Sequence, residues 1–472
     1  MGSVLQETTT GRPLWGVDLR MLTGTAADDD RFSVLQADEL ERAADADTFR
    51  RNPLTRVRAT GLLAKPWWLP VLEGLDPYTQ TVDSLRKVVL APEAVAAFPY
   101  DWRLSVAYNG AVLARTARAH LTRWRDQVAS RSEWRAAGER QPRLVFAAHS
   151  MGGLVVRAAM EQDPELAADT RAVVTVGTPF LGSAKTVLTL NLLCAGARPR
   201  WLLRQVQAMA ATLPGVHDLL PGYRCLDIGL DIARLTPSDV ARFGGDRDLA
   251  ARSLDEHTRR WEQPFAMPGH RAVVGEAQAT VQTLAELPQA IVVGRRHAFD
   301  VGDDGELVRD PASGVPARRD TRGDGTVHLP SAQAGITAVT YVFGQHGTLM
   351  RHDEVLRQIR NITLERASGA RMADSNKAGA GLETPYLGGS VGQPLTLHVT
   401  GLLNPAGVSL TVRSATSGRL GHPLTLRRDI DRPDGAFASR FIPDAPDLYR
   451  VTLDTGADVP ITQLILVTPP DA

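Results

Sequence analysis

Hydrophobic and polar positions around residue 150 follow three successive patterns. Leu144–Ala148 is an unbroken apolar run, His149–Gly153 contains two glycines, and Leu154–Met160 is again apolar apart from a single arginine. An apolar run of this length fits a strand buried on both faces, and the longer stretch after the small residues fits a helix. The pattern therefore predicts a buried strand, a sharp turn and a helix.

The flanking segments extend this pattern into an alternation of helices and strands. Apolar residues from Val106 to Trp124 recur at steps of three and four, which is typical of one face of a helix. A second buried strand is expected at Ala172–Gly177, and later strands at Ala272–Gly275 and Ile336–Phe343 precede a helix at about Glu354–Ile362. This order implies right-handed, parallel packing in a sheet that helices cover on both faces.

Two segments interrupt the alternation. Helical, Leu- and Arg-rich sequence between Lys185 and Trp261 predicts a cap inserted into the sheet domain at about residues 186–261. The charged, Gly-rich stretch Phe299–Gly323 is expected to be a surface excursion that leads into an active-site loop. Residues 1–370 are therefore predicted to form one α/β domain with a mostly parallel central sheet.

After Arg371 the composition becomes linker-like, and the hydrophobic period then changes to two. Leu395–Val399, Val408–Val412 and Tyr449–Leu453 alternate apolar and polar residues, with Gly, Pro and Asp between them. Short alternating strands of this kind are typical of an antiparallel β-sandwich. We expect a linker at 371–386 and a β-sandwich domain at 387–472.

Composition narrows the classes of function. The 53 basic and 53 acidic side chains leave no formal net charge, so nothing favours binding to nucleic acid or to an anionic membrane. No run reaches the roughly 18 apolar residues of a membrane helix, so contact with lipid surfaces is expected to be peripheral. Two cysteines, Cys194 and Cys225, fit no metal-site spacing and leave a single disulfide bridge open.

The start of the chain bears on localisation. Residues Met1–Leu5 lack the charged region, apolar run and cleavage site of a signal peptide. A cytoplasmic protein is expected for the chain as it stands, and a secreted one if the true start lies upstream.

Ala148-His149-Ser150-Met151-Gly152 matches the nucleophile elbow G-x-S-x-G, with alanine in the first position. A tight strand-to-helix turn holds the serine in a strained conformation with its hydroxyl exposed, and only small neighbours fit around it. The motif alone is weak, but here it lies between an expected strand and an expected helix. The less favoured interpretation is that Ser150 is only a helix N-cap.

A serine hydroxyl needs a base to accept its proton, and in this fold the partners follow in the order Ser, Asp, His. Asp324 lies between two glycines after a long loop, where it either orients the base or merely shapes a turn. His346 follows the last expected strand of the sheet and precedes a helix, so it is the favoured base. The other histidines considered are His352, expected in or capping that helix, His149, expected to point into the turn, and His328, beside the acidic loop.

These residues, with several further motifs, resemble those of the lecithin:cholesterol acyltransferase family, in the same order along the chain. The motifs are Phe98–Arg103, the elbow, Val176–Gly182, His217–Pro221, Gly323–Val327, and His346 with Ile359. The resemblance covers about residues 1–362. It implies an α/β-hydrolase with a catalytic triad of Ser150, Asp324 and His346, one oxyanion-hole N–H from Met151, and a cap over the acyl site that includes His217–Pro221.

The polar residues of the Phe98–Arg103 motif allow two interpretations. Asp101 and Arg103 are expected to form a supporting ion pair, with Trp102 in the core. Binding of substrate by these groups is the alternative.

The chain departs from the family at its start. Members open with an apolar strand and a Pro-Gly-x-x-Gly-Ser turn whose backbone supplies the second oxyanion donor, whereas Met1–Leu5 resembles only the end of that turn. Met1 therefore stands where this donor is expected. Either the start lies farther upstream, or the protein lacks a central strand and half of its oxyanion hole. Losing one donor costs roughly a hundredfold to a thousandfold in rate.

The resemblance implies a serine-dependent lipid ester hydrolase or O-acyltransferase. Such an enzyme moves an acyl group from a glycerophospholipid-type ester, through an acyl-serine, to an alcohol or to water, and needs no metal and no organic cofactor. Hydrolysis versus transfer, the acyl donor and acceptor, protein partners and the role of the β-sandwich stay open. The alternative function is a catalytically impaired hydrolase-fold binding protein whose β-sandwich mediates interactions.

Overall fold

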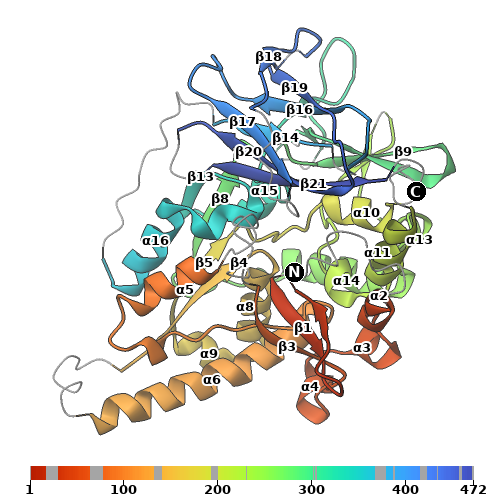
Figure 1. The fold of residues 1–472 in the computed structure, drawn as a ribbon. Coiled ribbons are helices and arrows are strands. Elements are labelled where there is room, and N and C mark those ends of the chain that lie inside the picture. The colour runs from red at the N-terminus through yellow and green to blue at the C-terminus, as the bar shows by residue number, and fades with distance from the viewer. Residues whose placement is uncertain are drawn as a thin grey trace.

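The computed structural model describes residues 2–16, 30–63, 78–131, 141–192, 200–229, 231–300, 302, 306–366, 379–385, 388–414, 423–432, 434–456 and 460–469. Its centre is a parallel sheet in the order β13 (Val339–Phe343), β8 (Arg271–Glu276), β5 (Thr170–Val176) and β4 (Leu144–His149) (Figure 1). These four strands confirm the parallel sheet that the apolar runs predicted.

Helices cover both faces of this sheet, as expected for alternating side chains of buried strands. Val173 lies in one core cluster with Leu154 and Val155 of α8 (Met151–Gln162). Its neighbour Val174 lies in another, with Val355 of α16 (Asp353–Thr363). Successive residues of β5 therefore point to opposite, helix-covered faces.

The long helix α6 (Val106–Ser130) packs against α8 at a glycine. A Cβ added to Gly110 would lie 2.9 Å from the Cβ of Ala158 and 3.0 Å from the backbone nitrogen of Ala159. This close approach lets α6 support the helix that follows the elbow.

The strand β4 is less buried than its sequence predicts. Within this sheet it pairs only with β5, and none of the described residues forms a strand beside its other edge. Leu144, Val145 and Phe146 are partly buried and Ala147 is exposed. Burial of a parallel strand needs neighbours on both edges as well as helices on both faces, and here one edge faces a groove instead.

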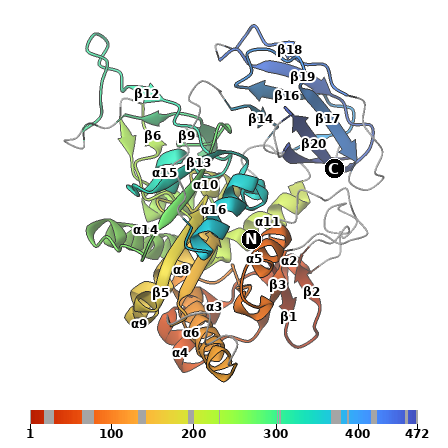
Figure 2. The ribbon, with the colours of Figure 1, turned by 90° about the vertical axis from the view of Figure 1, so that its left-hand side faces the viewer.

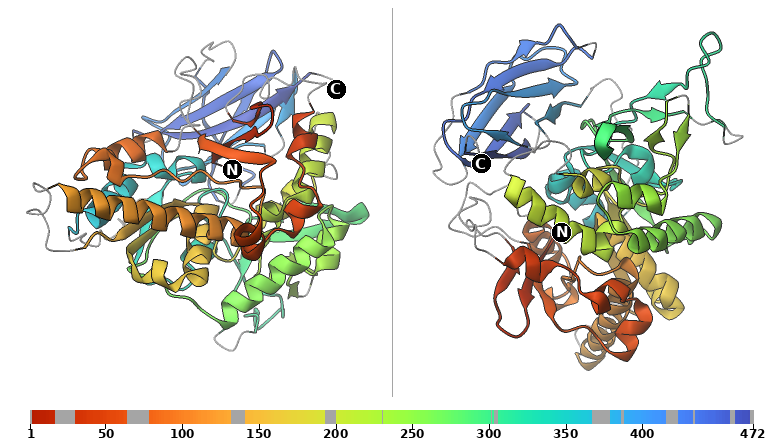
Figure 3. Two further views of the ribbon diagram at one scale, coloured as in Figure 1. Left: turned by 90° about the horizontal axis from the view of Figure 1, so that it is seen from below. Right: turned by 90° about the vertical axis from the view of Figure 1, so that its right-hand side faces the viewer.

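The N-terminal residues form elements that the sequence analysis did not assign. β1 (Ser3–Glu7) lies between β2 (Pro13–Trp15) and β3 (Val57–Leu62) in a small antiparallel sheet. Short helices follow at α2 (Arg31–Leu35), α3 (Glu39–Ala43), α4 (Ala46–Arg51), α5 (Thr79–Arg86) and η2 (Pro92–Ala94). Figure 3 shows this sheet at the end of the molecule away from the C-terminal strands.

The segment predicted as a cap is mostly helical. It contains α10 (Lys185–Leu190), α11 (Arg200–Thr212), α12 (Pro214–His217), α13 (Pro237–Arg242) and α14 (Arg247–Glu262). Two short strands that were not predicted, β6 (Leu226–Asp227) and β7 (Ile232–Ala233), join β9 (Thr283–Leu287) and β10 (Ile291–Arg295) in a second sheet. The remaining elements of this part are α9 (Pro164–Ala168), η3 (Pro288–Ala290), β11 (Ala298–Phe299), β12 (Arg318–Arg319), α15 (Leu329–Gln333) and η4 (His346–Arg351).

The C-terminal residues form two four-stranded sheets that share one core, the C-terminal sandwich (Figure 2). One sheet has the order β14 (Gly381–Glu383), β16 (Leu395–Thr400), β19 (Phe437–Phe441), β18 (Arg427–Arg428). The other has the order β15 (Gly389–Ser390), β21 (Ile461–Thr468), β20 (Asp447–Asp454), β17 (Ser409–Ser414). All pairs are antiparallel except β15 with β21.

One boundary differs from the expectation. β14 falls within the segment 371–386 that was predicted to be a linker, and it pairs with β16. Its three residues are buried, so this stretch belongs to the sheet and not to a solvated connection. Residues 371–378 lie outside the described part of the chain.

Candidate active site

Ser150 lies at the turn between β4 and α8, as the elbow motif predicts. Its backbone has φ 56° and ψ −131°, a conformation that costs a non-glycine residue on the order of 1–3 kcal/mol. The Ser150 N–H donates to Val176 O over 2.9 Å, which ties the turn to β5. Ser150 occupies the N-cap position of α8, but its side chain makes no capping hydrogen bond to that helix.

Three side chains from distant parts of the sequence meet at this turn. The His346 Nε2 atom lies 2.9 Å from Ser150 Oγ, and His346 Nδ1 lies 2.7 Å from Asp324 Oδ2. His346 begins η4, in the loop after β13, and its N–H also donates to Asp324 O over 2.8 Å. The structure therefore brings together the three residues that were predicted to form the triad.

The Asp324 carboxylate shapes the turn and also contacts the imidazole of His346, the two roles that the sequence left open. Its Oδ1 accepts hydrogen bonds from Thr326 N over 3.0 Å and Val327 N over 2.8 Å, so the carboxylate shapes the turn. Its Oδ2 faces His346. With 1% of its surface exposed, the carboxylate is held by backbone donors on one side and by the imidazole on the other.

Three buried polar residues that follow β8 hold the loop around Asp324, and sequence reasoning missed all three. The Gln278 N–H donates to Gly323 O over 2.9 Å, and Thr280 Oγ1 accepts from Gly325 N over 2.9 Å. The Gln282 side chain donates to Asp320 Oδ1 over 2.6 Å and accepts from the Thr321 backbone and hydroxyl. The three residues are spaced by two after a strand that the sequence predicts, and this spacing is the signal that could have found them.

His149 supports the histidine loop and does not simply point into the turn. Its Nε2 lies 2.9 Å from His346 O, and its Nδ1 lies 3.1 Å from Tyr78 Oη. A carbonyl can only accept, so Nε2 carries the hydrogen and Nδ1 accepts from the tyrosine. Burial, and then the neighbouring imidazole of His346, lower the pKa of His149 well below its ordinary value and keep it neutral. Burial also raises the pKa of Tyr78 to about 12.

The two remaining candidate histidines lie elsewhere. His352 is the N-cap of α16, where its side chain accepts from Glu354 N, as predicted. His328 is buried, and its ring centroid lies 4.6 Å from that of Tyr223. His346 is therefore the histidine that the fold presents to the Ser150 hydroxyl.

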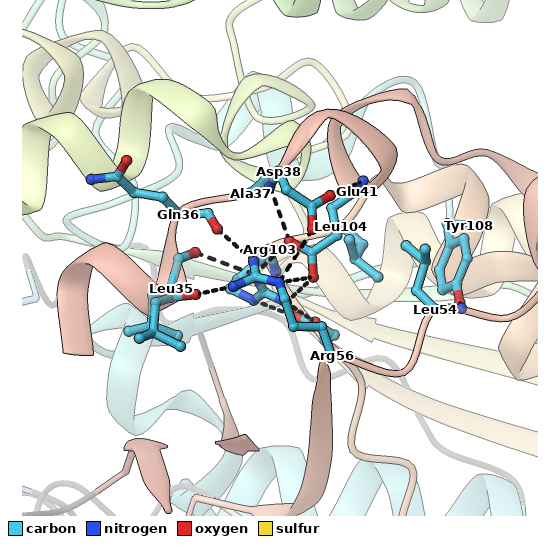
Figure 4. A network of polar contacts seen from close by, with 12 residues as sticks. Leu35, Gln36, Ala37, Asp38, Glu41, Leu54, Arg56, Arg103, Leu104 and Tyr108 are labelled. Carbon is cyan, nitrogen blue, oxygen red and sulfur yellow. Dashed lines mark hydrogen bonds and ion pairs between the residues drawn. The ribbon is translucent and has the colours of Figure 1, made fainter. Parts of the chain in front are cut away.

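The Asp101–Arg103 ion pair is confirmed as a structural feature, with the fully buried Arg103 guanidinium 2.7 Å from Asp101 Oδ2. The same guanidinium lies 2.9 Å from Glu41 Oε1, and Arg56 contacts this glutamate as well (Figure 4). Trp102 is 2% exposed and belongs to the main core cluster. This network joins α3 to the segment before α6 and does not reach the Ser150 hydroxyl.

The oxyanion donors are described only in part. Met151 is the first residue of α8, so its N–H has no acceptor within the helix and points out of the helix N-terminus. Met1, the second predicted donor, lies outside the described residues. Gly2 lies beside Tyr78 and lines the same groove as Ser150.

A groove of about 1390 Å³ runs along the free edge of β4. Ser150 and His346 line it at one end of the strand, and Leu144 and Arg171 at the other. Apolar side chains of α5, α6, β4 and the segment 88–98, such as Leu85, form part of its walls. None of the described residues of 186–261 lines this groove, and the placement of this segment over an acyl site stays a prediction.

Segment 186–261 is joined to the start of α6 by a hydrogen bond. The His217 Nδ1 atom lies 2.9 Å from Leu213 O, and Nε2 accepts from Asp246 N over 3.0 Å. Asp218 Oδ2 accepts from Val106 N, the first residue of α6, over 2.6 Å. The His217–Pro221 motif therefore joins the cap to the rest of the domain.

Other features bear on ligands. Within the described ranges, no group of three or more His, Cys, Asp and Glu side chains is placed to hold a metal ion. The same residues include no helix long and apolar enough to cross a membrane. Cys225 is a buried free cysteine, and Cys194 lies outside the described part of the chain.

Residues 12–226 match the model of the lecithin:cholesterol acyltransferase family. The match includes the elbow and ends before Asp324 and His346. No curated protein sequence matches the chain.

Solved structures give weaker likenesses. The Tle4–Tli4 complex has a chain 15% identical, with a TM-score of 0.44 over 78% of this chain and 97% of that one. The lipase BlEst2 of Bacillus licheniformis, in its propeptide form, is 11% identical, with a TM-score of 0.28 over 77% and 83%. The phospholipase PlaB of Legionella pneumophila is 11% identical, with a TM-score of 0.19 over 78% and 82%.

Proposed function

We propose, from the match of residues 12–226 to the lecithin:cholesterol acyltransferase family, that the chain is a member of this family and a serine-dependent hydrolase or acyltransferase of lipid esters. The observation that carries the proposal is the continuous contact from Asp324 Oδ2 through His346 to Ser150 Oγ, at 2.7 and 2.9 Å. A hydroxyl, an imidazole and a carboxylate that contact one another in this order form the catalytic triad of acyl-transfer enzymes.

In the proposed reaction Ser150 Oγ attacks the ester carbonyl carbon while His346 Nε2 accepts the hydroxyl proton. The Asp324 carboxylate accepts from Nδ1–H and so fixes the tautomer in which Nε2 is free to act as the base. The tetrahedral oxyanion takes a hydrogen bond from the Met151 N–H. Collapse breaks the ester C–O bond, and the leaving alkoxide takes the proton from His346.

An acyl-serine remains, and water or an alcohol then attacks it. His346 accepts the proton of the incoming hydroxyl, and Ser150 leaves with that proton restored. We propose that the acyl chain lies in the groove along β4. The apolar walls beside Ser150, formed by residues such as Val82, Leu85 and Val155, favour an acyl chain over a polar group.

The test is covalent labelling of the full-length protein with a fluorophosphonate, alongside hydrolysis of p-nitrophenyl esters of increasing chain length. We expect labelling of wild type, none of Ser150→Ala, and a preference for longer acyl chains in kcat/KM. Activity retained by Ser150→Ala would refute the assignment. Adding an acceptor alcohol measures how the acyl group divides between hydrolysis and transfer.

A second candidate is a catalytically impaired binding protein with the same fold. The edge of β4 that lacks a described neighbouring strand favours it, because Met1, where the second oxyanion donor is expected, lies outside the described residues. The fluorophosphonate separates the two candidates, since only an activated serine reacts. A folded wild-type protein that does not label would support the binding protein.

A further inference from the structure

The C-terminal sandwich rests on the carboxyl ends of β8 and β13, the two strands that lead toward Asp324 and His346. A Cβ added to Gly379 would lie 2.4 Å from Phe343 Cδ1 and 2.7 Å from Ala277 Cβ. One added to Gly381 would lie 2.6 Å from Ala277 O. The backbone that enters β14 is therefore in direct contact with the residues that follow β8.

Gln278 joins this backbone to the loop of Asp324. Its Nε2 donates to Ala380 O over 3.0 Å and its Oε1 accepts from Leu382 N over 3.3 Å, so the amide bridges two residues of the sandwich. Its own N–H donates to Gly323 O over 2.9 Å. The side chain is 1% exposed. One buried residue thus contacts the sandwich on one side and the neighbour of Asp324 on the other.

The residue before Gln278 is strained. Ala277 has φ 72°, in the left-handed region that a residue with a Cβ adopts at a cost on the order of 1–3 kcal/mol. Such a conformation persists only where the surroundings impose it. Here Gly379 and Gly381 pack against Ala277. The next residue, Gln278, donates its N–H to the carbonyl of Gly323. The sandwich is part of what holds this strained backbone in place.

We propose that the C-terminal sandwich braces the loop that carries Asp324, and that Gln278 is the positioning residue through which it does so. The inference rests on the proposed function, because the loop needs bracing only if Asp324 orients His346. Gln278 acts through the position of Gly323 and Asp324. This gives the sandwich a part in the reaction that needs no ligand of its own.

The test uses Gln278→Met in the full chain, since methionine matches the length of glutamine but neither donates nor accepts as an amide does. Misplacing a reacting group by about 1 Å costs about a hundredfold in rate, so partial release of the loop is expected to lower kcat about tenfold. KM is expected to change less than about twofold, because Gln278 does not contact the groove.

A double-mutant cycle separates positioning from a general structural role. If Gln278 acts through Asp324, then adding Gln278→Met to Asp324→Asn lowers the fluorophosphonate labelling rate by less than about twofold. Equal losses in the two backgrounds, or an unchanged kcat in Gln278→Met alone, would overturn the proposal. If Gln278→Met does not fold, the same cycle is run with Gln278→Asn, whose amide falls one methylene short of β14.

The matched control is Gln463→Met in β21. The Gln463 side chain donates to Leu382 O and accepts from Thr384 Oγ1, so this variant removes comparable bonds inside the sandwich without touching Gln278. Its kcat is expected to stay within about twofold of wild type, and a loss as large as that of Gln278→Met would overturn the proposal. Failure of the wild type to label is a different result, because it removes the proposed function itself.

Discussion

A single methyl group placed at Gly177 tests the arrangement of the triad directly. Gly177 follows β5 with φ +57°, and a Cβ there would lie 2.9 Å from Asp324 Oδ2, 3.0 Å from Leu349 Cδ1 and 3.2 Å from His346 Nδ1. Ordinary van der Waals contact begins near 3.4 Å, so Gly177→Ala pushes the carboxylate and the imidazole by a few tenths of an ångström. The strained φ adds about 1–2 kcal/mol.

We expect Gly177→Ala to lower the free energy of unfolding by about 1–3 kcal/mol, because the backbone strain and the crowding add together. Because the displaced groups are the orienting carboxylate and the proposed base, kcat is also expected to fall about ten- to hundredfold, with KM nearly unchanged. Urea unfolding gives the first quantity, and initial rates with a p-nitrophenyl ester give the second.

Gly269→Ala is the matched control. Gly269 also has a left-handed φ, of +50°, and its added Cβ would lie 2.6 Å from Arg171 O, near the start of β8 and far from the triad. It should lose comparable stability while kcat stays within about twofold. Wild-type kcat in a folded Gly177→Ala protein, or an equal loss in Gly269→Ala, would refute the reasoning.

Three further predictions follow from single groups. Asp324→Asn is expected to lower kcat about ten-thousandfold because the amide favours the wrong tautomer of His346; rates with the p-nitrophenyl ester check this, and a loss below about tenfold would contradict it. His346→Ala should abolish turnover while His352→Ala, which removes a helix cap, should leave most of it; the reverse result would mean that the other histidine is the base. Burial raises the pKa of Asp218 from its ordinary 3.8 to about 6. The protonated carboxyl therefore adds to the free energy of unfolding below about pH 4, and this contribution is lost as pH rises through about 6. Asp218→Asn, which can still accept from Val106 N, should therefore gain stability over wild type more at about pH 8 than at about pH 5 in urea unfolding, and a difference that does not depend on pH would contradict this.

The elements with a strong local signal were predictable from the sequence. The apolar runs gave β5 and β8, the three- and four-residue steps gave α6, and the period of two gave β16, β17 and β20 of the sandwich. The elbow was recognisable because a strained serine needs small neighbours and a strand and helix around it, and all of these are local in sequence. Chain order and loop position then selected Asp324 and His346 from the other acidic and histidine residues.

The tertiary structure decided what depends on contacts between distant segments. The free edge of β4 could not be predicted, because an apolar run does not show how many strands will pair with it. His149 contacts Tyr78 and His346, and Gln278 joins β14 to the acid loop, across separations of 71 to 197 residues in sequence for the histidine and 102 to 104 for the glutamine. Hydrogen bonds of this kind leave no periodic trace in the sequence, since each partner is set by the packing of whole elements. The sequence by itself indicated which groups could carry the proposed chemistry, and only the fold decided what holds them within hydrogen-bonding distance of one another.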